Sequence, residues 1–114
     1  MEVVFGETEF HGDFMVQRVS IIDSITGIKW SGHAKSVVGE NLPIPVNNMV
    51  EYIMDAVASA RRGVEINRVY RLNNCLLSIR LVESSDPFIN ASKIYMEIIR
   101  ENKVLYNVAL HPHL

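Results

Sequence analysis

The stretch NMVEYIMDAVASARRG, residues 48–63, predicts the clearest element of the chain and separates two β-rich parts. Asn48 is a suitable helix N-cap, and Glu51 three positions later approximates a capping box with Asn in place of the usual Ser or Thr. Gly63 is a natural stop for such a helix. Apolar residues recur at helical spacing within the stretch, which predicts one buried face. That face consists of Val50, Ile53, Met54, Val57 and Ala58.

The residues before this helix predict three antiparallel strands, at 2–10, 14–23 and 28–38, because they are rich in β-branched and aromatic side chains. The first connection, His11-Gly12-Asp13, is a three-residue turn whose glycine can take a positive φ. The second connection is the four-residue segment 24–27.

The period of two in a strand sorts the side chains of these strands onto two faces. The core face contains Val3, Phe5, Met15, Val19, Ile21, Ile28, Trp30, Gly32 and Ala34. The opposite face is mixed and includes polar residues such as Arg18, Lys29, His33 and Lys35. It also gathers four apolar side chains, those of Phe10, Phe14, Val16 and Ile22.

The residues after the helix predict a hairpin of strands 64–72 and 75–83. Asn73-Asn74 forms its turn, since asparagine tolerates the positive φ of a two-residue connection. The register pairs Leu72 with Cys75 and places Arg68 on the core face, with Arg71 and Arg80 on the opposite face.

A second helix is expected from Asp86, its cap, and Pro87, its first residue, to Asn102-Lys103. Its apolar stripe is Ala91, Ile94, Tyr95, Ile98 and Ile99. Residues 104–110 predict a last strand, followed by a short tail. The sequence therefore predicts one α+β domain, residues 1–114, with antiparallel sheet in the order βββ-α-ββ-α-β and two helices packed on one face.

Composition limits the classes of function. The chain has 114 residues, a formal net charge of −2 and one cysteine, which suits a single domain without internal disulfides. Acids exceed cations eight to three in residues 1–57, whereas cations exceed acids eight to five in residues 58–114. Neither a signal-like start nor a membrane-length apolar run is present, so we expect a soluble cytoplasmic protein without a membrane partner.

No sequence pattern indicates catalysis, a cofactor or a metal. The chain lacks a nucleophile elbow, a phosphate-binding glycine loop and a zinc-binding helix motif. His111 and His113 flank a proline in the tail, a spacing that lacks a third ligand. Cys75 falls on the core face, where a thiol behaves as a small hydrophobe. A non-enzymatic role is therefore favoured.

The leading hypothesis is a small protein that acts by protein–protein interaction, of the inhibitor, immunity or adaptor type. Two helices cover one face of a small sheet, which leaves Phe10, Phe14, Val16 and Ile22 for another protein or a second copy in a homodimer. Internal cover by the last strand or by Leu42-Pro43-Ile44-Pro45 is the competing explanation.

The alternative hypothesis is a small-molecule, phosphate or other anion site on the hairpin that carries Arg68, Arg71 and Arg80. A guanidinium on the core face is costly unless it is paired, and Glu51, Asp55 or Glu97 are candidate partners for Arg68. A register displaced by one residue is the other explanation for Arg68 on that face. Nucleic acid is not favoured, because the hairpin lacks interleaved exposed aromatic residues.

Overall fold

The computed structural model describes residues 1–61, 66–82 and 93–113, and it contains seven strands and one helix. The elements are β1 (Glu2–His11), β2 (Phe14–Ile22), β3 (Lys29–Val37), α1 (Val46–Arg61), β4 (Asn67–Leu72), β5 (Cys75–Val82), β6 (Lys93–Arg100) and β7 (Lys103–His113). All seven strands belong to one antiparallel sheet in the order β1-β2-β3-β7-β6-β5-β4.

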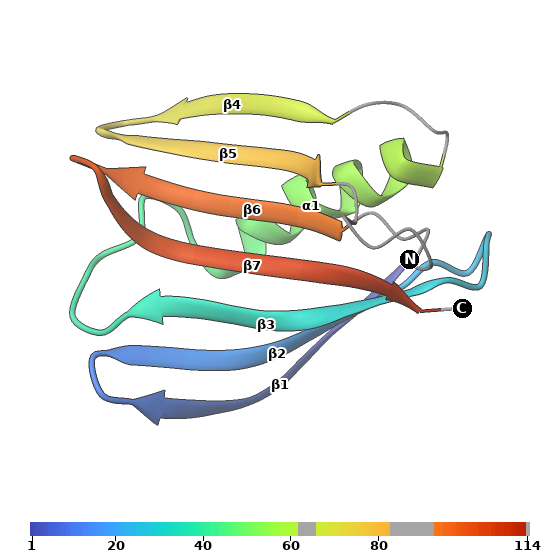
Figure 1. Ribbon diagram of the computed structural model, residues 1–114, viewed down its shortest axis with the longest axis horizontal. Coiled ribbons are helices and arrows are strands. Elements are labelled where there is room, and N and C mark those ends of the chain that lie inside the picture. The colour runs from blue at the N-terminus through green and yellow to red at the C-terminus, as the bar shows by residue number, and fades with distance from the viewer. Residues whose placement is uncertain (62–65, 83–92, 114) are drawn as a thin grey trace.

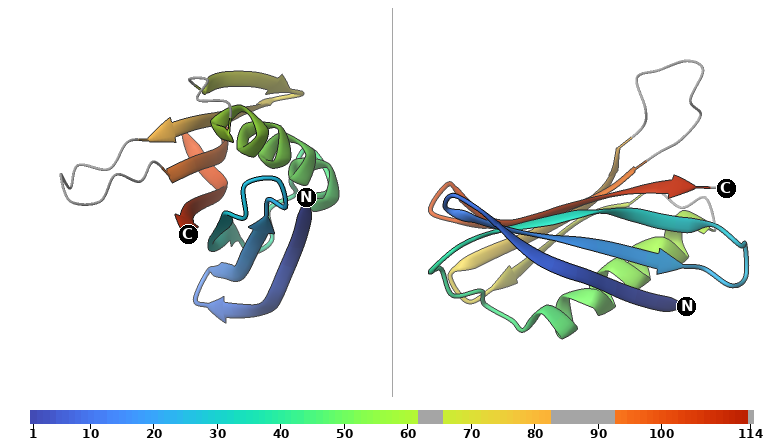
Figure 2. Two further views of the ribbon diagram at one scale, coloured as in Figure 1. Left: turned by 90° about the vertical axis from the view of Figure 1, so that its right-hand side faces the viewer. Right: turned by 90° about the horizontal axis from the view of Figure 1, so that it is seen from below.

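The sheet consists of two meanders joined in its middle (Figure 1). The first meander is β1–β2–β3 and the second is β4–β5–β6–β7, and the pairing of β3 with β7 connects them. Helix α1 carries the chain from β3, inside the sheet, to β4 at one edge, so it crosses one face. The sheet curls around the helix in the two further views (Figure 2).

The predicted order βββ-α-ββ-α-β is wrong, because Lys93–Arg100 is strand β6 rather than a second helix. The start expected at Asp86 and Pro87 lies outside the described residues. The Ile-rich spacing fits both periods, since Ile94 and Ile98 are four residues apart in a helix and also share one side of a strand. The segment forms a strand because it pairs with β5 on one side and with β7 on the other.

A two-residue turn follows β6 at the position where a helix end was expected. Glu101 and Asn102 both have positive φ, 51° and 62°, and they lie between the paired residues Arg100 and Lys103. Positive φ at both central residues is the conformation that joins two antiparallel strands tightly. The asparagine that suggested the end of a helix is therefore the second residue of a hairpin turn.

The hairpin of β4 and β5 confirms the register predicted from sequence. Leu72 pairs with Cys75, and Arg68 pairs with Ile79. Asn73 has φ 55°, as its turn position requires. Cys75 is buried on the core side.

The hairpin of β1 and β2 departs from the predicted register at an irregularity between Phe5 and Thr8. The first part of β1 keeps the expected pairing, with Phe5 opposite Val19. Beyond the irregularity Thr8 pairs with Gln17, so the second part of β1 has slipped by one residue. An extra residue in one strand moves every later side chain to the other face.

Helix α1 begins two residues before the predicted cap, because the carbonyl oxygen of Pro45 accepts bonds from the amides of Asn48 and Met49. Its buried face is turned by about one position from the prediction. Ile53 and Val57 are buried as expected, but Met49 and Ala56 replace Val50 and Met54 among the fully buried residues.

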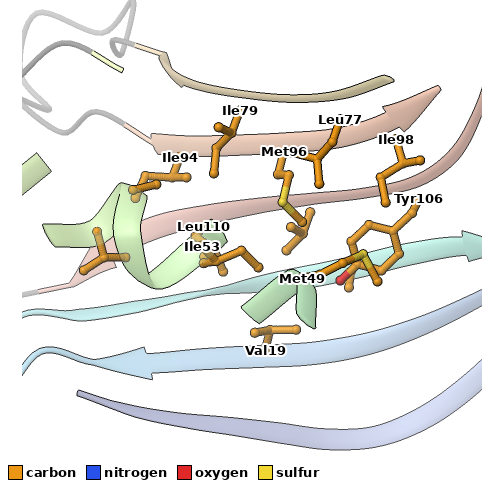
Figure 3. Packing of buried hydrophobic residues seen from close by; sticks show 14 of the residues in the cluster. Val19, Met49, Ile53, Leu77, Ile79, Ile94, Met96, Ile98, Tyr106 and Leu110 are labelled. Carbon is orange, nitrogen blue, oxygen red and sulfur yellow. The ribbon is translucent and has the colours of Figure 1, made fainter. Parts of the chain in front are cut away.

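The helix closes a core on the face of the sheet toward which the strands curl, which we call the concave face (Figure 3). The sheet residues of this core include Val19, Ile21, Trp30, Leu77, Ile79, Ile94, Met96, Ile98, Tyr106, Val108 and Leu110. The predicted core face of the first three strands is confirmed, since its residues all point to this side. The opposite side is called the outer face.

The described residues place no element across the outer face. Leu42 and Ile44, in the loop expected as internal cover, pack against the core on the concave side instead. The last strand, β7, lies within the sheet and shields neither of its faces. The described part of the chain also has no helix with the length and apolar character needed to cross a membrane.

Candidate functional site

The sheet brings together three of the four apolar residues expected to bind a partner. Phe14, Val16 and Ile22 alternate along β2 and point to the outer face. Phe10 is on the concave side, because the slipped part of β1 pairs it with Met15. The predicted four-residue patch is therefore a three-residue patch, and Phe10 belongs to a different surface.

The outer patch on β1 and β2 is partly open to solvent. Phe14 is 37% exposed and Ile22 is 38% exposed, and Val4 on β1 adds a side chain that is 47% exposed. The ammonium group of Lys35 lies 4.1 Å from the centre of the Phe14 ring. This cation–π contact places a positive charge directly on the patch.

Arg68 is held by the helix rather than left for an anion. Its guanidinium bonds the carboxylate of Asp55, and Nη2 donates to the hydroxyl of Ser59 at 3.2 Å. Tyr70 and Asp55 both raise the pKa of the guanidinium. Pairing with Asp55 was one of the explanations open from sequence, and it accounts for a cation on the concave side of β4.

The other two arginines of the hairpin, Arg71 and Arg80, lie on the outer face. The Arg80 guanidinium carbon is 5.3 Å from the centre of the Tyr95 ring on β6. The Tyr95 hydroxyl donates to Glu97 at 3.1 Å. Burial is the main cause that raises the pKa of the Tyr95 hydroxyl, and the hydrogen bond to Glu97 raises it as well. The three expected anion ligands are thus divided between two faces.

Positive charge is concentrated on the outer face. Among the described residues, outward positions hold six cations, namely Arg18, Lys29, Lys35, Arg71, Arg80 and Lys93. They hold three acids, namely Glu2, Glu9 and Glu97. This excess of cations occurs in a chain whose formal net charge is −2. The rest of the sequence therefore carries the excess of acids.

All four histidines also point outward, at His11, His33, His111 and His113. The last two are not in a tail, because β7 extends to His113 and pairs it with Lys29. The ring nitrogen Nε2 of His11 lies 3.1 Å from the carboxylate oxygen Oε2 of Glu9. No cluster of three or more metal-ligating side chains occurs within the described ranges.

Arg18, Lys29 and Lys35 are on the face predicted to be mixed, but they were not among the candidate binding residues. Side chains two residues apart lie on the same face of a strand, so this placement could be predicted from sequence. Arg18 shares the face of Phe14 on β2, and Lys29 and Lys35 lie on the same face of the neighbouring strand β3. Lys93 was missed because its segment was expected to be helical.

No protein-family model matches the chain, and neither a curated protein nor a solved structure does so.

Proposed function

We propose that this chain is a binding protein whose outer face docks a negatively charged protein. The observation that carries the proposal is the concentration of cations on that face, against the negative net charge of the whole chain. Complementary potentials steer association and select partners. An acidic protein surface is thus the partner that this face attracts.

Exposed apolar groups beside the cations favour a protein over a nucleic acid. Phe14, Ile22 and Val4 lie at outward positions of the first two strands, next to Lys35 and Arg18. Aromatic and aliphatic anchors surrounded by charge are typical of protein interfaces. Aliphatic side chains contribute little to binding a phosphate backbone, which depends mainly on cations.

A symmetric dimer through the outer faces is disfavoured by the same charges. A twofold axis brings the same patch of both copies together. Lys35 and Arg18 of one copy then face the cations of the other, and like charges in contact oppose association. The partner is therefore a different, acidic chain rather than a second copy.

The test places a photo-crosslinking amino acid at Phe14 on the outer face, and separately at Glu51, an exposed position on α1, as the matched control. Both variants are irradiated in the cells that naturally make the protein. We expect one discrete protein adduct from position 14 and none from position 51. The adduct protein is then purified and its affinity for the wild-type chain is measured.

Charge reversal on the same face decides whether the adduct reflects the proposed chemistry. Arg18→Glu/Lys35→Glu is expected to weaken the measured affinity by about tenfold or more and to reduce its dependence on salt. Circular dichroism checks that this double variant remains folded. Equal adducts from both positions, no adduct, a dimer of this chain, a nuclease-sensitive adduct, or an affinity unchanged by charge reversal each overturn the proposal.

A further inference from the structure

A pocket opens on the concave side of the sheet, away from the outer face and independent of it. Its volume is about 240 Å³. The residues that line it are Thr8, Met15, Gln17, Ala34, Ser36, Leu42 and Tyr106, from β1, β2, β3, β7 and the loop after β3. None of these lining residues carries a charge, and most of the wall is apolar.

The irregularity in β1 builds one side of this pocket. It turns Thr8 toward the concave side and opposite Gln17, whose side-chain amide donates to the carbonyl oxygen of Gly6 at 3.0 Å. Phe10 follows on the same side, next to Met15, and is 68% exposed. Met15, its partner in the pairing, is one of the lining residues, so the exposed Phe10 ring lies on the strand position next to the pocket wall.

The Tyr106 hydroxyl is a polar group of a pocket residue that has no hydrogen-bond partner in the described part of the chain. The side chain is only 5% exposed, and no other described residue forms a hydrogen bond with its hydroxyl. No side-chain oxygen without a partner is sealed from solvent in the described part of the chain, so this hydroxyl keeps some contact with solvent, and Tyr106 is one of the residues that line the pocket. Desolvation raises the pKa of Tyr106 to about 12, which keeps the group a neutral donor.

We propose that this pocket binds a small uncharged molecule with an aromatic or short alkyl body and one hydrogen-bond acceptor, which takes the hydrogen of the Tyr106 hydroxyl. The volume exceeds that of cavities of about 150 Å³ that hold a benzene ring. An ion is excluded because the lining offers no opposite charge to offset its desolvation. Met15 and Leu42 supply the apolar contact, and Ser36 and Thr8 supply polar groups nearby.

The test uses three probes of similar size: acetophenone, which has an acceptor; ethylbenzene, which has none; and benzoate, which is charged. Binding is measured by the NMR shifts of the Met15 and Leu42 methyl groups, with the exposed outer-face Leu76 as the reference. We expect acetophenone to bind with a dissociation constant on the order of 1 mM. Ethylbenzene should bind more weakly, and benzoate should not shift these signals.

Tyr106→Phe removes the hydroxyl and retains the ring. It should weaken the binding of acetophenone by about three- to tenfold, which is the effect of losing one hydrogen bond. The affinity for ethylbenzene should not change. Because the hydroxyl has no partner among the described residues, this variant should be at least as stable as wild type. Tyr95→Phe, on the outer face, is the matched control and should bind acetophenone as wild type does.

Three results overturn the inference: no probe shifts the Met15 and Leu42 signals, benzoate shifts them as much as acetophenone, or Tyr106→Phe leaves the preference for acetophenone intact. These results do not bear on the proposed function, because the pocket and the outer face lie on opposite sides of the sheet and are tested with different variants.

Discussion

The two faces of the sheet are built from the same seven strands and carry opposite chemistry. On the concave face, alternate residues are aliphatic and buried beneath α1, as with Ile98 and Leu110 at 0% exposed. On the outer face, the intervening residues are cations and half-exposed apolar groups such as Phe14. One face therefore supplies the stability of the fold, and the other, which no described element covers, is the face proposed to bind a partner.

Two matched isoleucine truncations give the largest expected contrast. Ile98→Ala on the concave face should lower the free energy of unfolding by about 2–5 kcal/mol, because it removes buried methyl groups and leaves a cavity. Ile22→Ala on the outer face, where the side chain is 38% exposed, should cost less than about 1 kcal/mol. Urea denaturation of both variants measures the difference. Similar losses at the two positions would mean that the outer face is covered after all.

Gly32 tests how closely the two meanders meet. A Cβ atom at this position would lie 1.7 Å from the carbonyl oxygen of Ala109, on the partner strand β7. The neighbouring atom is backbone, so Gly32→Ala must displace the β3–β7 pairing and should cost about 1–3 kcal/mol. In Gly6→Ala, the nearest atom is Cβ of Arg18 at 3.2 Å, so a smaller loss is expected. Thermal unfolding compares the two. A Gly32→Ala protein as stable as wild type contradicts the close approach.

The sequence predicts local structure well where a turn and an alternating pattern agree. The β4–β5 hairpin has both, with Asn73-Asn74 between two alternating runs, and its register is correct. The segment Lys93–Arg100 has an apolar pattern that fits a helix and a strand equally. Only its neighbours in the sheet, which are distant in sequence, resolve that ambiguity.

The candidate site was predictable to the same extent. Period-two alternation correctly places Phe14, Val16 and Ile22 on one face. It fails for Phe10, because the irregularity between Phe5 and Thr8 has no sequence signal other than Gly6. Tyr106 was not among the residues singled out from sequence, because the pocket that it lines forms only where Thr8 and Leu42 converge with it across the sheet.

The smallest predicted effect concerns the loop at the rim of the concave face. Glu40 joins this loop to the β6–β7 turn by accepting a bond from Nζ of Lys103 at 2.7 Å and a second from Arg100. Both bonds lower the pKa of the Glu40 carboxyl, and the bond from Lys103 has the larger effect. The folded state thus favours the charged form, and the stability it provides is present above the ordinary value of 4.5 and is lost as pH falls below it.

Glu40→Gln should consequently lower the urea midpoint at neutral pH, and the difference from wild type should shrink below about pH 4.5. High salt should reduce the neutral-pH difference as well, because these groups are accessible to solvent. The same variant should loosen Leu42, which lies two residues along the loop and lines the pocket. It should therefore weaken the binding of acetophenone more than any substitution on the outer face does. A difference in midpoint that persists unchanged at about pH 3 would show that the carboxylate charge does not hold the loop. The closure of the concave face would then depend on the apolar contacts of Leu42 and Ile44 alone.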